Sequence, residues 1–213
     1  VIHEDIRPSL PLVEKMSGIA TELLGELPVN IDVSVKGEIS VHDASILGVS
    51  ALKGALLAVG AEEVTYVNAP GLAAERGMVS AVTNTAECHE YRSMITLRAT
   101  TGTGKAMSID GTLMGIKQTQ KIVGIDSFHL DLPPTDNILF IRYIDRPGIV
   151  GIVGQTLGEA KVNIAAMQVA RSKAGGTALM VLTVDSQVSE DIVAKVKKDT
   201  EADYVHSVFL EDK

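Results

Sequence analysis

The fold of the second half of the chain is decided by the stretch Arg142-Tyr143-Ile144-Asp145-Arg146-Pro147-Gly148-Ile149-Val150. An apolar run ends at Ile144, one acid follows, and Pro147 then presets the backbone for the start of a helix. The free N–H groups at the first turn of such a helix, with the positive end of its dipole, favour a bound carboxylate. Gly148 would let the backbone approach that ligand closely.

Outward from this turn, residues 137–210 show one clear order of elements. Apolar patterns predict strands at 138–144, 162–171, 177–184 and 204–210. The first predicted helix carries on one face Ile149, Val153, Leu157 and Ala160. The second follows a Ser189 cap, with acids in its first turn and lysines toward its end, as the helix dipole favours. The order β-α-β-β-α-β is the ferredoxin-like arrangement.

The polar side chains near this turn are complementary to a free amino acid. Asp145 can accept from an ammonium group, Asn163 can both donate and accept, and Tyr143 adds a hydroxyl. The proposed set is completed by the backbone of Pro147, Gly148, Ile149 and Val150. Two simpler interpretations stay open, with Asp145 as a helix cap and Asn163 as a turn residue.

The first half begins with helical patterns around one strand. A helix is predicted at 8–25, followed by a half-buried strand at 29–36. Asp43 can cap a second helix, whose expected apolar stripe is Ile46, Val49, Leu52, Leu56 and Val59. A short third helix is expected to open at Asn68 and close at Gly77.

Residues 78–125 are predicted to form antiparallel strands, the last at about 119–125. The link Thr101-Gly102-Thr103-Gly104 supplies the glycines that a hairpin turn needs. The clearest domain boundary is Leu132-Pro133-Pro134-Thr135, because two prolines can neither extend a helix nor join a central strand.

Composition excludes several classes of function. The 213 residues carry a net charge of −8, which argues against a nucleic-acid partner and an anionic membrane surface. No apolar run approaches the roughly 20 residues of a membrane span, and the single Cys88 excludes an internal disulfide. A cytoplasmic location is expected. The start lacks an initiator Met, which we interpret as a piece cut from a longer chain.

Catalysis and metal binding find little support in the sequence. Cys88 and His89 are neighbours in the chain, and such neighbours rarely face each other as nucleophile and base. The five histidines are scattered singly, without the spacing of a known metal motif. No catalytic residue, metal ligand or cofactor is therefore expected in this chain.

Residues 138–210 resemble an ACT domain, on the strength of Asp145-Arg146-Pro147-Gly148 and Val162-Asn163-Ile164. Residues 29–132 resemble the intervening, allosteric-substrate-binding domain of long-form D-3-phosphoglycerate dehydrogenases. That likeness is carried by Tyr66-Val67-Asn68-Ala69-Pro70, Ala74-Glu75-Arg76-Gly77 and Lys121-Ile122-Val123-Gly124-Ile125. The expected fold is α+β, with an antiparallel-sheet intervening domain followed by a ferredoxin-like βαββαβ ACT domain at 137–213. Residues 1–28 would be a helix and linker from the missing catalytic part.

The resemblance implies a regulatory role in L-serine biosynthesis. In the family, L-serine is the feedback inhibitor and binds between ACT domains of two chains, at positions matched here by Tyr143, Asp145 and Asn163. It implies self-association as a dimer or tetramer, and missing catalytic domains that bind NAD and act as the oxidoreductase. The alternative is a purely architectural oligomerisation module with a vestigial ligand site.

The resemblance also implies an anion site in the intervening domain. Lys121 and His129 match its pattern. Phe128 and Pro133 stand where related members carry arginines, and the loss of bidentate arginines weakens phosphate binding.

Overall fold

The computed structural model describes residues 2–210, and these residues form two compact units. The first contains the chain up to Asp126 together with Asp131–Pro134, and the second contains Ser127–Leu130 with the residues from Thr135 onward. None of the helices within residues 2–210 is both long and apolar enough to cross a membrane.

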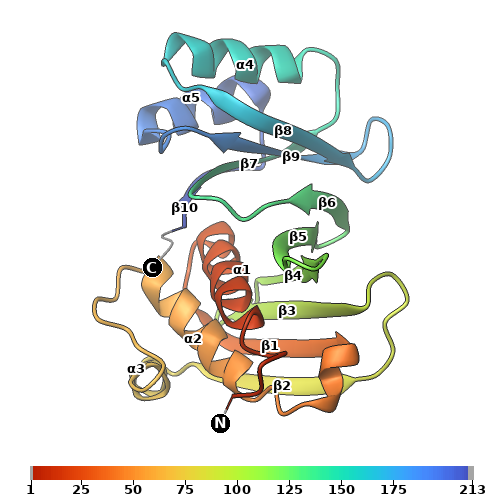
Figure 1. The fold of residues 1–213 in the computed structure, drawn as a ribbon. Helices are drawn as coiled ribbons and strands as arrows, with labels where there is room; N and C mark the ends of the chain where they lie inside the picture. Colours follow the sequence, from red (N-terminus) through yellow and green to blue (C-terminus); the bar gives the residue numbers. More distant parts are fainter. Residues whose placement is uncertain (1, 211–213) are drawn as a thin grey trace. The chain divides into compact units, whose positions relative to one another are not determined.

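The first unit is built on a sheet with the strand order β2-β1-β3-β4-β5-β6 (Figure 1). The strands of this sheet are β1 (Pro28–Gly37), β2 (Val79–Thr85), β3 (Ser93–Thr101), β4 (Ala106–Met114), β5 (Thr119–Ile125) and β6 (Phe128–Leu132). Only the last two residues of β6 are counted in the first unit. Its helices are α1 (Ser9–Leu24), the short 3-10 helix η1 (Glu38–Val41), α2 (Ile46–Ala58) and α3 (Ala69–Glu75). Helix α1 packs over β3 and β4, and α2 packs over β1 and β2.

Most predicted elements of this unit are confirmed, but β2 is not antiparallel. It runs parallel to β1, with partners from Asn30↔Val79 to Lys36↔Thr85. A parallel pair needs a long crossover, and α2 and α3 supply it between the two strands. The predicted antiparallel order holds for β3, β4 and β5, including the hairpin at Thr101–Gly104. Strand β6 was not predicted.

The expected apolar stripe of α2 is right at Leu52 and Leu56, which are buried, and wrong at its other three positions. Ile46 and Val49 are only partly buried and Val59 is exposed, whereas Leu47, Ala51 and Ala55 are fully buried. The reason is close packing on α1. A Cβ placed on Gly54 would lie 2.1 Å from the carbonyl oxygen of Glu14, so the two helix backbones touch. Small residues therefore share the buried face of α2 with its leucines.

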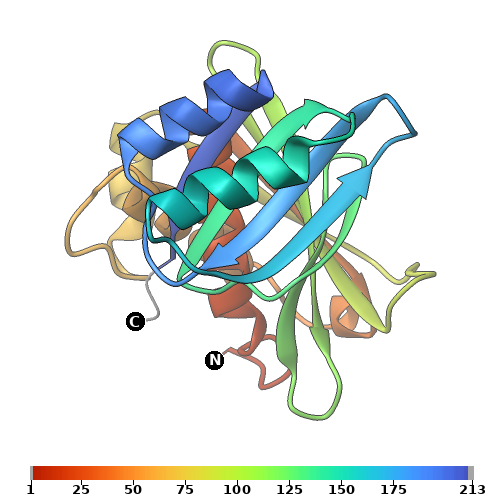
Figure 2. The ribbon, with the colours of Figure 1, turned by 90° about the horizontal axis from the view of Figure 1, so that it is seen from above.

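The second unit confirms the ferredoxin-like order. It consists of β7 (Asn137–Ile144), α4 (Ile149–Glu159), β8 (Ile164–Arg171), β9 (Thr177–Val184), α5 (Glu190–Thr200) and β10 (Tyr204–Phe209). The strand order is β10-β7-β9-β8, with all three pairings antiparallel. Helices α4 and α5 pack together over one face of the sheet (Figure 2). The core between helices and sheet includes Leu139, Ile141, Val153, Leu157 and Met180.

Candidate functional site

The turn between β7 and α4 is built around Gly148. Its φ of +95° lies in the left-handed region, where a side chain is strained. The helix therefore begins at Ile149, with Gly148 as its cap residue, and not at Pro147 as predicted. Pro147 lies exposed in the loop ahead of the cap. The side chain of Ile149 is buried in the core, so its backbone N–H is the group it can offer a ligand, while Val150 is exposed.

Asp145 is fixed in this turn by two contacts. Its backbone N–H donates to the carbonyl oxygen of Gly176 at 2.8 Å. Its carboxylate accepts from Nη1 of Arg171 at 3.1 Å, on a side chain that is only 18% exposed. The Arg171 side chain is 56% exposed, and such a partly exposed pair contributes little to stability. A ligand ammonium could therefore replace the guanidinium at small cost.

Tyr143 is a buried residue near Asp145. Its side chain is 2% exposed and belongs to the core of the second unit. Burial raises the pKa of the Tyr143 hydroxyl, the charge of Asp145 raises it further, and the Arg171 guanidinium acts in the opposite direction. The hydroxyl therefore stays protonated at neutral pH and can donate a hydrogen bond.

Asn163 lies far from the other predicted site residues of the same chain. Its Nδ2 donates to Oδ2 of Asp185 at 2.8 Å, just before β8 begins. Pairing of Arg171 with Ala178, and of Ala178 with Tyr143, places the far end of β8 beside the Asp145 turn. Seven residue steps along β8 correspond to about 23 Å. One chain thus brings Tyr143, Asp145 and Gly148 together, but leaves Asn163 at the opposite end of the sheet.

Strand β8 is an edge strand with little cover. It is the last strand in the order of its sheet, and most of its residues are exposed. Met167 is 43% exposed and Val169 39%. Unpaired apolar edges of this kind favour pairing with another strand.

The two residues of the predicted anion site lie on β5 and β6. Nζ of Lys121 is 2.9 Å from Oδ1 of Asp131, so its charge is already matched by a carboxylate. The side chain of His129 is exposed.

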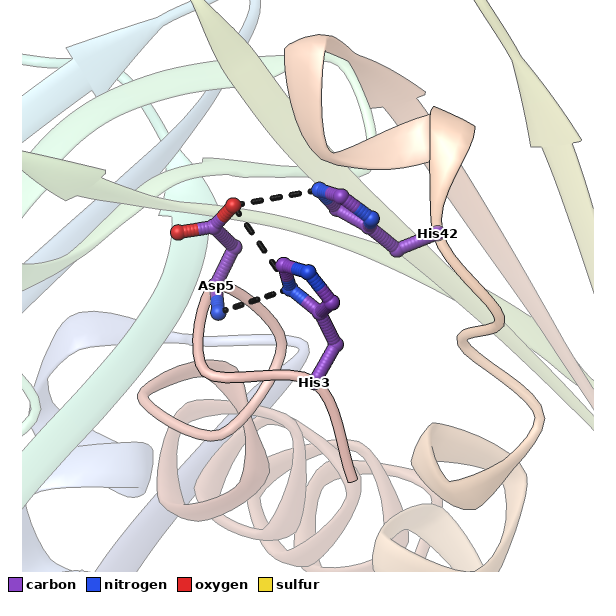
Figure 3. Close-up of side chains that lie close together, drawn as sticks. All are labelled: His3, Asp5 and His42. Carbon is purple, nitrogen blue, oxygen red and sulfur yellow. Dashed lines mark hydrogen bonds and ion pairs between the residues drawn. The ribbon is translucent and has the colours of Figure 1, made fainter. Parts of the chain in front are cut away.

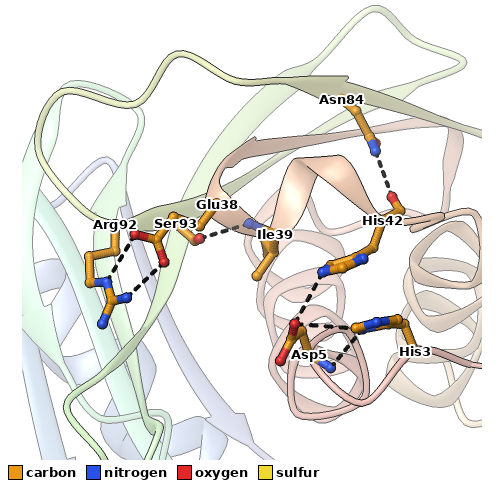
Figure 4. A network of polar contacts seen from close by, with 8 residues as sticks. All are labelled: His3, Asp5, Glu38, Ile39, His42, Asn84, Arg92 and Ser93. Atoms are coloured by element: carbon orange, nitrogen blue, oxygen red, sulfur yellow. Dashed lines mark hydrogen bonds and ion pairs between the residues drawn. The ribbon is translucent and has the colours of Figure 1, made fainter.

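Two further polar groups in the first unit escaped the sequence analysis. His3, Asp5 and His42 meet across 37 residues of chain (Figure 3), where only the short His-x-Asp spacing hints at a cluster. Beside Asp5, a hollow of about 440 Å³ is lined by polar residues that include Ser9, Glu38 and Arg92 and by apolar residues. The Glu38 carboxylate accepts from both Nε and Nη2 of Arg92 at 3.2 and 2.9 Å, so this arginine is already paired (Figure 4).

Comparisons with known proteins agree with both halves of the architecture. The family model described as the D-3-phosphoglycerate dehydrogenase intervening domain matches residues 5–126, and the ACT domain model matches residues 137–201. Similar proteins named D-3-phosphoglycerate dehydrogenase come from Mycobacterium tuberculosis (40% identity), Synechocystis (33%) and Bacillus subtilis (28%). The alignments cover 90%, 92% and 90% of this chain, but only 36%, 35% and 36% of these relatives.

Proposed function

Because this chain belongs to the D-3-phosphoglycerate dehydrogenase intervening-domain family and carries an ACT domain, we propose that it is the regulatory region of such a dehydrogenase and binds L-serine between two ACT domains. NAD and the hydroxy-acid substrate belong, in this proposal, to catalytic domains elsewhere in a cytoplasmic parent protein. In this proposal the intervening domain spans 29–132 and the ACT domain 137–213, and the helix of the N-terminal segment 1–28, expected as a linker from the catalytic part, packs on the sheet of the first unit.

The observation that carries the proposal is the separation of Asp145 from Asn163 along an uncovered edge strand. If two copies pair antiparallel through β8, the start of one β8 lies beside the end of the other. The Asn163 of the second chain then comes close to the Asp145 turn of the first. A twofold pair contains two such sites, related by symmetry.

Each group of L-serine has a matching partner in this arrangement. The carboxylate can accept from the free backbone N–H groups at the start of α4, at Ile149 and Val150. The ammonium can replace the Arg171 guanidinium at Asp145, and the hydroxyl can bond to Asn163 of the second chain. Two or three charge-assisted hydrogen bonds of roughly 1.5–3 kcal/mol each, less the entropy of binding, allow an affinity on the order of micromolar to tens of micromolar.

Regulation follows if serine prefers one arrangement of the paired chains. Its effect on the parent enzyme can be no larger than its difference in affinity for the two arrangements.

Isothermal titration with L-serine, beside L-alanine and D-serine, tests the ligand. We expect saturable binding of L-serine alone, lost in Asp145→Ala and in Asn163→Ala. A more specific test mixes the two variants after separation into single chains. In a mixed pair one site carries both substitutions and the other carries none, so the mixture should regain about a quarter of the wild-type sites.

The matched control is either variant separated and reassociated with itself, which should show no binding of L-serine. A mixture that regains no binding, while both single variants are folded, would contradict a site shared between chains. If the unsubstituted chain and both variants bind L-serine equally, Asp145 and Asn163 are not part of the serine site.

An architectural module without a ligand is the rival function. The pairs Lys121–Asp131 and Arg171–Asp145 favour it, because both polar sites are satisfied within the chain. A dimer or tetramer that shows no heat and no shift in melting temperature with millimolar serine would support this alternative.

A further inference from the structure

His3, Asp5 and His42 form a compact cluster of metal-ligating groups in the first unit (Figure 3). Oδ2 of Asp5 lies 3.1 Å from Nε2 of His42 and 3.6 Å from Nδ1 of His3. The two imidazole rings stack with their centroids 3.6 Å apart. One ligand atom from each residue lies within 4.8 Å of the other two.

These separations are close to those of a tetrahedral metal site. With metal–ligand bonds of about 2.0–2.1 Å, two ligand atoms on one tetrahedral edge are about 3.3 Å apart. The distances of 3.1 and 3.6 Å from Asp5 bracket this value. The two ring nitrogens approach each other further if His3 turns out of the stack. Its side chain is 45% exposed, so the ring has room for that rotation.

The backbone holds both parts of the cluster in place. The carbonyl oxygen of His3 accepts from the N–H groups of Ile6 and Arg7, and the Ile6 side chain is fully buried. On the other side, the carbonyl oxygen of His42 accepts from Nδ2 of Asn84 at 2.9 Å (Figure 4). The turn after His42 is closed by Oδ1 of Asp43, which accepts from the Ser45 N–H. Only side-chain rotation is thus needed to bind an ion.

We propose that His3, Asp5 and His42 bind a zinc ion, or a similar borderline transition-metal dication, with a fourth position left to solvent. Two imidazoles and one carboxylate suit such ions, whereas Ca²⁺ and Mg²⁺ require mostly oxygen ligands. The bound ion replaces the 3.3 Å contact between the Asp5 N–H and Nδ1 of His3. It fastens the segment that leads into α1 to the loop that follows η1.

The ligand chemistry also separates this site from the other polar groups of the unit. Arg92 lines the nearby hollow, but its guanidinium pairs with Glu38 and provides no ligand atom for a metal. His89 is exposed and lies outside the cluster, which makes it a matched control for histidine loss.

The test is isothermal titration of the chelator-treated chain with zinc chloride, paired with visible spectra of the cobalt(II)-loaded protein. We expect one zinc per chain, cobalt bands typical of tetrahedral coordination that zinc abolishes, and an unfolding midpoint raised by several degrees with saturating zinc. His42→Ala and Asp5→Asn should each weaken zinc binding at least about tenfold, because each removes a ligand. His89→Ala should bind zinc with the affinity of the unsubstituted chain.

The proposal is overturned if the unsubstituted chain binds no zinc at micromolar concentrations. It is overturned equally if His42→Ala and Asp5→Asn keep the parent's stoichiometry and affinity. Circular dichroism of each variant separates loss of a ligand from loss of the fold, since a folded variant with unchanged secondary structure can fail only at the site.

Discussion

At the scale of single residues, Gly148 carries the strongest conformational demand in the candidate site. A Cβ at this position would meet no atom within 4 Å, so any cost of Gly148→Ala comes from its φ of +95° and not from a clash. We expect this substitution to lower the free energy of unfolding by about 1–2 kcal/mol. Because it also shifts the N–H groups of the first helical turn, L-serine affinity should fall with it.

Gly151→Ala is the matched control for that measurement by denaturant unfolding. Gly151 lies in the regular part of α4 with open space around it, and alanine is favoured there by up to about 1 kcal/mol. Equal stability of the two variants would show that the left-handed turn is not retained in solution.

His206 makes the stability of the second unit depend on pH. Burial lowers the pKa of His206, and the positive charge of Lys197 adds to this effect. The unfolded chain therefore binds a proton more readily than the folded one, so stability is full above about pH 6.5 and falls as the pH drops through the lowered folded value. Unfolding midpoints between neutral and mildly acidic pH should show this loss.

His206→Gln should flatten that pH dependence, whereas the exposed His89→Gln should leave it unchanged. If the parent and His206→Gln respond to acid in the same way, His206 is not the group that is charged on unfolding.

At the scale of elements, the close contact between α1 and α2 constrains the first unit. Gly54 lies against the Glu14 backbone, and Lys53 pairs with the Glu14 carboxylate at 2.9 Å. Gly54→Ala should destabilise the unit by about 1–3 kcal/mol or more, because the added methyl group forces the helices apart. Gly71→Ala, in α3 with nothing within 4 Å, is the control and should not destabilise.

Local patterns predicted the elements of the second unit well, and β9 has the predicted bounds of Thr177 and Val184. Local patterns did not predict strand direction or helix burial where these depend on the packing of a neighbouring element. Alternation in β2 cannot reveal whether its neighbour runs parallel, and the burial of α2 depends on how closely α1 approaches. The cluster of His3, Asp5 and His42 was missed for the same reason, because 37 residues separate its two parts without any periodic signal.

At the scale of the whole molecule, the two units are organised around separate sheets, each ending in an exposed edge strand. The second unit has its own core, so a fragment from Thr135 onward should fold alone. We expect it to self-associate through β8, and Met167→Lys should make it monomeric, because a charged side chain on an edge disfavours strand pairing. Sedimentation or light scattering measures the change.

The control uses the full chain and the other exposed edge. Val79→Lys on β2 should leave self-association unchanged, although Val79 is 60% exposed. Association lost through Val79→Lys but kept in Met167→Lys would assign the interface to the first unit instead.

The distance between Asp145 and Asn163 has a consequence for how a signal would be read. Because Asp145 and Asn163 lie at opposite ends of one sheet, a single chain cannot form the proposed binding site, however much ligand is present. Where most chains are solitary, the number of such sites grows with the square of protein abundance, so a twofold dilution removes about three quarters of them. If the proposed serine site forms in this way, its signal depends on the amount of protein and the amount of amino acid together, and vanishes when the protein is scarce.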